Sequence, residues 1–381
     1  MEFRWPFNNI KTKHWVGINL STLAPSAVIY CDEGVVDAVA YDEEQGVEAL
    51  ASWIKKHVSH GMPTVLVLDD DDYELLLAEA PDVPDEELTA AIEFRIGDLL
   101  AQPITETAIQ AIRLPADAYR GRMSMAHVIA SKNETISARV QWAKDLHLSI
   151  EMITVPEISL LNVLAASSVG QGIALLKLGP KHGTIRLYQA GALYLTRTIE
   201  VGIEALDIQH IEEAPEKTVN TGLNKHSDDA KRNEINLEEM IVEDEMNSDF
   251  ILTDDVEISD LQLEEDAEQD IVINEQEYVG FAPKAKVNEQ QVQSLVLEVQ
   301  RSLDYYESQL GMGQITQLWL MSGNVDLTHL VDAMQPALTA NVEQPNILEK
   351  LKHADINIAD SIEEINSTVM ALGGALAYVA N

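Results

Sequence analysis

Cysteine and positive charge are scarce in this chain of 381 residues. Its one cysteine, Cys31, excludes an internal disulfide framework and any zinc site built from several cysteines, which suits a reducing compartment. We expect its thiol to be buried, because it lies in the apolar run SAVIYC. Lysine and arginine number 25 against 64 aspartates and glutamates, a formal net charge of -39. A protein of that charge repels phosphate backbones, so we expect no nucleic acid partner.

Long apolar runs are missing as well. The amino-terminal sequence MEFRWPFNNIKTKHW has no apolar stretch of signal-peptide length, so we expect the chain to begin in the cytoplasm. The most apolar window, residues 158–178, is broken by polar residues and two glycines and indicates helix, turn and strand, not a membrane span. The sequence stops directly after a helical pattern, so continuation of a longer natural protein into a membrane stays open.

Two parts of the chain repeat one pattern. The runs WVGINL, SAVIY and VVDAVAY predict three consecutive strands, followed by a helix over residues 47–54 and the buried strand PTVLV. The runs IALLKL, TIRLYQ and LYLTRTIEV predict a second set of three strands. With 46% hydrophobic residues, the chain can form the cores of roughly two to three domains. Two similar halves indicate an internal duplication.

The segment between these halves predicts a small α+β domain over residues 81–149. Three carboxylates after Pro84 favour the start of a helix, because anions are stabilised at the positive end of the helix dipole. Strands at TAIQAIRL and MSMAHVIAS follow, then a helix from about residue 134 to 146 and the strand SIEMITV.

The composition changes between residues 204 and 284. Residues 241–280 hold 15 acidic residues and no lysine or arginine, so we expect a flexible, solvated insertion that carries much of the net charge. The insertion also contains scattered apolar residues such as Phe250 and Leu261, so short binding motifs within it are an alternative to a passive loop. Order is expected again in the helix VQSLVLEVQRSLDYYESQL, the buried strand ITQLWLM and a last helix. Gly373 and Gly374 in that last helix favour close approach of another backbone.

Five strings resemble, in the same order, the family of the MSHA biogenesis protein MshI and the type IV pilus assembly protein PilM. They are VLDDDDYELLLAEAPDVPDEELTAAIEFRIGDLL, DLHLSIEMITVPEISLLNVL, YQAGALYLTRTIEVG, VQRSLDYYESQL and VMALGGALA. The resemblance implies an α/β, ribonuclease-H-like, actin-like fold of two lobes. Residues 1–80, 150–170 and 362–381 are then the first lobe, and residues 171–203 and 285–361 the second. The inserted domain is residues 81–149, and the acidic insertion is residues 204–284.

Relatives in this family that bind ATP use three loops, and the resemblance places each of them here. The first phosphate loop, an acid followed by Gly-Ser-Ser, begins at Gly17, and Asn19 stands in place of its acid. The second, an Asp-Ile-Gly pattern, has Lys177 in place of its acid. The nucleoside loop reads Ser322-Gly323-Asn324-Val325. The implied nucleotide-binding residues are Asn19, Ser21, Lys177, Gly179, Ser322 and Gly323.

Loss of both loop carboxylates matters, because they normally organise magnesium and its water. We therefore expect no hydrolysis, no catalytic residue and no required cofactor. Lys177 can still neutralise a phosphate, so ATP as a structural ligand stays open. An actin-like ATP-binding enzyme is the contrasting alternative.

The resemblance implies a non-catalytic assembly platform of an MSHA-type type IV pilus machine, cytoplasmic and held at the inner membrane by its partners. It binds the cytoplasmic amino-terminal tail of an inner-membrane protein and links that protein to the assembly ATPase. The cytoplasmic domain of a type II secretion L-type protein, which docks the secretion ATPase, is the alternative. The implied groove lies between the first lobe and the inserted domain. Candidate lining residues, some expected to be core, are Ile92, Phe94, Ile104, Ile112 and Leu114.

Other polar features have simpler interpretations. The run Asp69 to Asp72 follows a buried strand without calcium-loop spacing, so we expect a solvated strand exit. Glu157 matches a glutamate at the lobe junction of the family, but a glutamate at a helix start also satisfies nearby N–H groups. His57 and His60 have no visible third ligand, so no metal site is expected.

Overall fold

The computed structural model describes residues 14–167, 172–208, 287–323, 325–354, 356–359, 362 and 366–377. The predicted acidic insertion, residues 204–284, lies outside the described residues except for its first five, and Asn324 lies outside as well. In the part of the chain that is described, no helix is long and apolar enough to cross a membrane.

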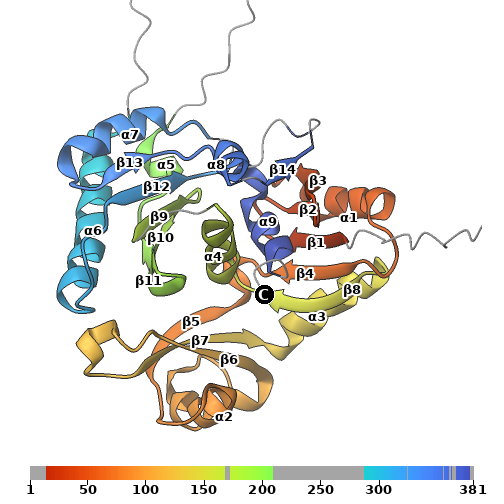
Figure 1. Cartoon of the computed structure of the whole chain (residues 1–381), viewed down its shortest axis with the longest axis horizontal. Helices are drawn as coiled ribbons and strands as arrows, with labels where there is room; N and C mark the ends of the chain where they lie inside the picture. Colours follow the sequence, from red (N-terminus) through yellow and green to blue (C-terminus); the bar gives the residue numbers. More distant parts are fainter. Residues whose placement is uncertain are drawn as a thin grey trace, which may run out of the picture. The chain divides into compact units, whose positions relative to one another are not determined.

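Two sheets repeat the same strand order (Figure 1). In spatial order, the first sheet consists of β14 (Asn357–Ile358), β3 (Gly34–Ala40), β2 (Ser26–Cys31), β1 (His14–Asn19), β4 (Pro63–Val67) and β8 (Ser149–Thr154). The second consists of β11 (Ala192–Ile199), β10 (Gly183–Gln189), β9 (Ile173–Leu178), β12 (Gln317–Met321) and β13 (Asn341–Glu343). In each, an antiparallel meander meets a parallel strand, since β1 pairs with β4 and β9 with β12. The predicted duplication is confirmed.

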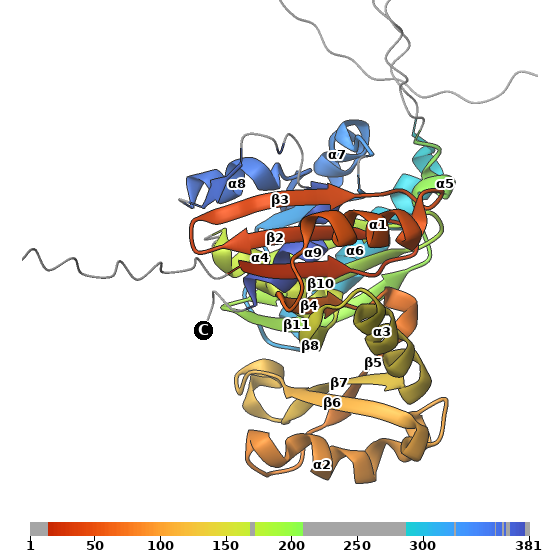
Figure 2. The same ribbon diagram turned by 90° about the vertical axis from the view of Figure 1, so that its right-hand side faces the viewer.

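A third, antiparallel sheet has the order β5 (Glu74–Glu79), β7 (Met125–Lys132) and β6 (Thr107–Arg113). Helix α2 (Asp85–Ile96) covers one face of it, with Leu88, Ile92 and Ile96 in a shared core (Figure 2). Strand β5 precedes residue 81, so the inserted unit begins earlier than predicted. Helix α3 (Asn133–Asp145), expected in the inserted domain, instead places Ala143 in the core of the first lobe.

The first sheet is covered on both faces, as the continuous apolar runs of its central strands predict. Helices α1 (Gly46–His57) and α3 pack on one face. Helices α4 (Pro156–Ala166) and α9 (Val369–Leu376) pack on the other and reach the second sheet through one core, so they lie between the two sheets (Figure 1). Strand β2 is buried throughout, and Cys31 with it, as expected.

The outer face of the second sheet is covered by α6 (Glu289–Ser308) and α7 (Thr328–Met334). The predicted apolar face of α6 is confirmed, since Val292, Leu295, Val299, Leu303 and Tyr306 are buried. The two remaining α-helices of the described residues are short: α5 (Ile203–Leu206) and α8 (Ile347–His353). The backbone N–H of Asn288 donates to the carbonyl of Leu206 (3.0 Å). The chain therefore re-enters the second lobe next to the point where it leaves.

Close backbone contact explains the glycines of α9. A Cβ on Gly373 would lie 2.0 Å from the carbonyl oxygen of Ser159 on α4. A Cβ on Gly17 of β1 would lie 1.8 Å from the carbonyl oxygen of Ala371. No side chain fits at either distance, so glycine lets α9 pack directly on β1 and α4. The predicted close approach is confirmed.

Candidate functional site

A cavity of about 510 Å³ lies where segments following β1, β9 and β12 meet. Strands β9 and β12 are neighbours in the second sheet, whereas β1 belongs to the first sheet, so segments of both lobes line the cavity. The cavity is lined by all six residues that the resemblance assigns to nucleotide binding: Asn19, Ser21, Lys177, Gly179, Ser322 and Gly323. The fold thus brings together three segments that lie far apart in the sequence.

Several polar groups of these loops are occupied by bonds inside the protein. The Asn19 side-chain amide donates to the carbonyl of Ala24 (3.0 Å), and the Ser322 hydroxyl donates to the carbonyl of Leu178 (2.8 Å). The N–H of Gly179 donates to the carbonyl of His182 (2.8 Å). Pro180, next along that loop, has no N–H. Phosphate loops rely on free backbone N–H groups, so these positions offer little to a phosphate.

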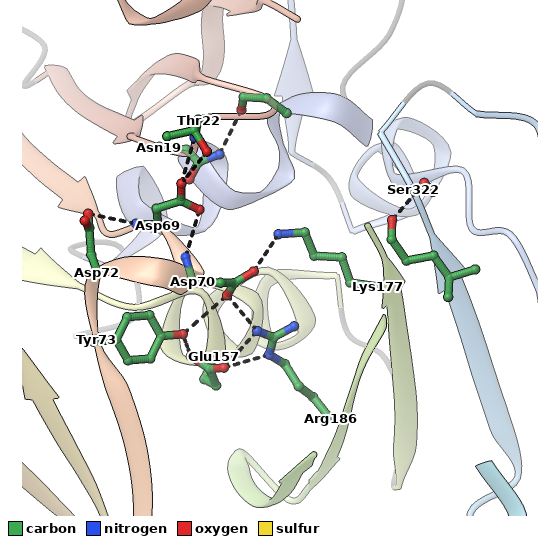
Figure 3. A network of polar contacts seen from close by, with 12 residues as sticks. Asn19, Thr22, Asp69, Asp70, Asp72, Tyr73, Glu157, Lys177, Arg186 and Ser322 are labelled. Carbon is green, nitrogen blue, oxygen red and sulfur yellow. Dashed lines mark hydrogen bonds and ion pairs between the residues drawn. The ribbon is translucent and has the colours of Figure 1, made fainter. Parts of the chain in front are cut away.

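Beside this cavity lies a compact group of charges, the Arg186 cluster: Asp70, Tyr73, Glu157, Lys177 and Arg186 (Figure 3). The guanidinium Nη2 of Arg186 lies 2.8 Å from Glu157 Oε1 and 3.1 Å from Asp70 Oδ1. Lys177 Nζ lies 3.1 Å from the other oxygen of Asp70. The Tyr73 hydroxyl donates to Glu157 Oε2 (2.6 Å). Two cations are therefore matched by two carboxylates.

The electrostatics of the cluster favour the charged forms of Arg186 and Asp70. Arg186 is 1% exposed, and burial alone opposes its charge. The carboxylates of Glu157 and Asp70 outweigh that effect and raise the pKa of the guanidinium. Burial likewise opposes the charge of Asp70, but Lys177 and Arg186 lower the pKa of its carboxyl. The pKa of Tyr73 is raised by burial and by the charge of Glu157, so its hydroxyl remains a donor.

Asp69 and Asp72 have structural partners, so the predicted solvated strand exit is wrong for these two residues, whereas Asp71 is exposed. The carboxylate of Asp69 is buried and accepts from the backbone N–H (2.8 Å) and the hydroxyl (2.9 Å) of Thr22. Asp72 accepts two bonds from Arg139 (2.9 and 2.8 Å). The sequence shows only a run of like charges, whereas the fold sends successive side chains toward different partners.

The sequence marks two residues of the cluster, Lys177 and Glu157, but not their partners. Lys177 was expected to be able to neutralise a phosphate, but its ammonium already contacts Asp70. Glu157 lies at the lobe junction as the resemblance implies, and its side chain bonds to Arg186 and Tyr73 rather than to helix N–H groups. Sequence reasoning missed Arg186 itself. The available signal was one arginine between apolar residues in TIRLYQ, because a buried arginine requires carboxylates.

The histidines considered as metal ligands have other contacts. His57 Nδ1 lies 2.8 Å from Asp37 Oδ2, and its ring stacks on Trp53. The ring of His60 packs against that of His147. Among the described residues, no group of three or more histidine, cysteine, aspartate or glutamate side chains is arranged to hold a metal ion.

A second cavity, of about 240 Å³, lies on the face of the three-stranded sheet that α2 leaves uncovered. The sheet contributes Leu75, Ile112, His127 and Ile129, α4 contributes Glu157, Ile158 and Leu161, and the start of β11 contributes Ala192 and Leu193. We call this cavity the β7 groove. It lies between the inserted sheet and elements of both lobes.

Of the predicted groove residues, Ile112 alone lines the β7 groove. Ile92 is fully buried on the inner face of α2, and Leu114 is buried in the core of the second lobe, so neither can contact a partner. Phe94 is 91% exposed on α2, and Ile104 lies half-buried before β6. The pattern of apolar residues identified the segment but not which face of its sheet stays open.

The comparisons with known proteins concern the fold. No protein-family model and no curated protein sequence matches the chain. It is similar to a chain of the PilM–PilN type IV pilus biogenesis complex, with TM-score 0.57 and 13% identity over 96% of this chain and 98% of that chain. A Bacteroides thetaiotaomicron protein of unknown function with an actin-like ATPase fold gives TM-score 0.43 and 8% identity. The match covers 92% of this chain and 98% of that chain.

The cytoplasmic domain of EpsL, an inner membrane component of the type II secretion system of Vibrio cholerae, gives TM-score 0.36 and 15% identity over 49% of this chain and 71% of that chain. The sheet order on its own shows two duplicated lobes, as the sequence predicts. The chain has the actin-like fold that the sequence predicts, and it is similar in structure to PilM over nearly its whole length.

Proposed function

We propose that this protein is a non-catalytic assembly platform whose β7 groove binds a peptide segment of a membrane protein. The observation that carries the proposal is an apolar row left open on the inserted sheet. Leu77 is 40% exposed and Ile112 is 38% exposed on that face. Apolar pockets beside a sheet accept the alternate side chains of an extended peptide, which is a common mode of peptide recognition.

The likeness to PilM supports a role in a type IV pilus machine at the cytoplasmic face of the inner membrane. The solved relative is described as a complex of PilM with PilN. By analogy, the occupant of the groove is the cytoplasmic amino-terminal tail of an inner-membrane assembly protein. The finer assignment, an MshI-type protein of an MSHA pilus that links this tail to the assembly ATPase, rests on the sequence strings.

The proposal includes the absence of ATP hydrolysis. Asn19 and Lys177 stand where two carboxylates are needed to hold magnesium and its water, and Lys177 is paired with Asp70. We expect no magnesium-dependent phosphate release above the level of a protein-free control. Turnover of about 1 per second, at the low end of ordinary enzymes, would show that the chain is an ATPase.

ATP as a structural ligand is the second candidate, because the six predicted loop residues line one cavity of about 510 Å³. That volume lies within the range of about 300–1,000 Å³ typical of small-molecule sites. This candidate predicts that ATP raises the melting temperature without magnesium and that Lys177→Ala abolishes the shift. An unchanged melting temperature at millimolar ATP counts against it.

The experiment that tests the platform is a pull-down of the full chain from its own cell, read by mass spectrometry. Ile112→Asp places a charge in the groove at an exposed position. Phe94→Asp makes the same kind of change on the outer side of α2 and is the matched control. We expect inner-membrane pilus components with wild type and Phe94→Asp, and their loss with Ile112→Asp. Equal recovery of these components with all three proteins would show that they do not bind in the β7 groove.

A further inference from the structure

The acidic run that follows β4 contacts both phosphate-type loops (Figure 3). Asp69 Oδ2 accepts from the backbone N–H (2.8 Å) and the hydroxyl (2.9 Å) of Thr22, the residue directly after Ser21 of the first loop. In a phosphate loop, backbone N–H groups of this kind donate to the bound anion. The buried Asp69 carboxylate therefore accepts bonds that a phosphate would otherwise accept.

The next carboxylate in the run contacts the second loop. Asp70 Oδ2 lies 3.1 Å from Nζ of Lys177, and Asp70 Oδ1 lies 3.1 Å from Nη2 of Arg186. Lys177 is the one cation among the described residues that line the cavity of about 510 Å³, and its side chain is 30% exposed. Asp70 comes from the first lobe, whereas both cations come from the second. One carboxylate thus joins the two lobes beside the cavity.

Local structure holds Asp70 in this position. It begins a short 3₁₀-helix, Asp70–Asp72, which is capped by Asp69, whose Oδ1 accepts from the N–H of Asp70 (2.8 Å). Asp72 in turn accepts from the N–H of Asp69 (3.3 Å) and from Arg139 (2.9 and 2.8 Å). All of these bonds are made within the protein, so the fold itself positions Asp70 against Lys177.

The other charges on the cavity wall are negative. Asp42 and Glu204 line the cavity, and both are exposed. Because Lys177 is already paired with Asp70, the described part of the wall offers no unmatched cation to a ligand. A molecule with several phosphate charges would therefore approach two carboxylates and gain no free positive charge.

We propose that Asp69 and Asp70 replace the phosphate anion inside this fold: one carboxylate takes the donors of the first loop, and the other takes the cation of the second. The cavity then excludes nucleoside polyphosphates, and Asp70 is the residue that determines this exclusion. ATP is thus rejected by carboxylates that are present, in addition to the loss of those at positions 19 and 177. The proposal is independent of the β7 groove, which Asp70 does not line.

The test is a calorimetric titration of the full chain with inorganic tripolyphosphate and with ATP, without magnesium and at low ionic strength, where charge attraction is strongest. We expect no saturable binding to wild type up to about 1 mM. Asp70→Asn keeps the shape of the side chain and leaves Arg186 paired with Glu157, so the protein should stay folded. It frees Lys177, and both probes should bind at least about tenfold more tightly than to wild type.

Asp71→Asn is the matched control, because it removes the same charge from an exposed neighbour. It should bind no better than wild type. Lys177→Met in the Asp70→Asn background should abolish the gained binding. Melting curves show whether each variant is folded, and Asp70→Ala tests the same point if Asp70→Asn unfolds.

Saturable binding of either probe to wild type overturns the proposal, and for ATP it is the result that a structural nucleotide predicts. The proposal is also overturned by an equal gain in Asp71→Asn or by a gain that survives Lys177→Met. A folded Asp70→Asn or Asp70→Ala protein that gains no binding would overturn it as well. None of these results bears on the pull-down with Ile112→Asp, so failure here is distinct from failure of the platform.

Discussion

A guanidinium that is 1% exposed is costly to bury unless opposite charges and hydrogen bonds surround it. Glu157 and Asp70, both from the other lobe, supply the opposite charges and the hydrogen-bond acceptors for Nε and Nη2 of Arg186, whereas Nη1 has no partner among the described residues. Lys177 completes the charge balance from the strand next to Arg186. The Arg186 cluster therefore joins the two lobes by ion pairs at a position beside the nucleotide-type loops. Removal of one member leaves another charge unmatched.

At the residue scale we predict that Arg186→Ala lowers the free energy of unfolding by about 3–5 kcal/mol, because it leaves Glu157 buried without its cation. Arg197→Ala, on the adjacent strand β11, is the control. Its side chain is 42% exposed, so the loss should stay within about 0.5 kcal/mol. Urea unfolding of both variants measures the difference. Equal losses would mean that the cluster does not hold the lobes together.

The cluster also shows where sequence reasoning fails at this scale. Lys177 and Glu157 were recognisable because each occupies a position marked by the family resemblance. Their partners were not recognisable, since Asp70 and Lys177 are separated by 107 residues and no local pattern links them.

At the element scale, the packing of α9 gives a test of the fold. Gly373→Ala would bring a Cβ to 2.0 Å from the backbone of α4, so α9 must shift. We predict a loss of about 1–3 kcal/mol, the usual effect of overpacking, despite the better helix propensity of alanine. Gly97→Ala, where a Cβ meets nothing within 4 Å, is the matched control and should be neutral. Thermal or urea unfolding checks both, and a neutral Gly373→Ala would contradict the packing.

Elements whose apolar pattern is local were predictable, and the assignment of elements to sheets was less so. The two meanders, α6 and α9 follow from periodicity and glycine positions. Strand β5 has an ordinary strand pattern, but its hydrogen bonds go to β7, which lies about fifty residues further along the chain. Helix α3 has the expected length, yet its buried side packs on the first sheet. The residues of β5 do not indicate that it pairs with β7, and the residues of α3 do not indicate that it packs on the first sheet.

At the scale of the whole molecule, the ends of the acidic insertion are held together by the bond between Asn288 and Leu206. We predict that a short Gly/Ser linker in place of residues 209–286 leaves both lobes folded, because closing a shorter loop costs less entropy. The variant should unfold cooperatively at a melting temperature no lower than that of the full chain. Loss of cooperative unfolding would show that the insertion contributes to the core.

The central claim is that the groove containing Ile112 binds its partner through apolar contacts, although the chain carries a net charge of -39. It is tested most directly by titrating the amino-terminal tail peptide of the inner-membrane partner into the full chain at low and at high salt. Calorimetry should give nearly the same Kd at both, since apolar contacts are not screened. Ile112→Asp should abolish binding and Phe94→Asp should preserve it. Unchanged affinity for a folded Ile112→Asp protein, or a Kd that weakens steeply with salt, would contradict the account.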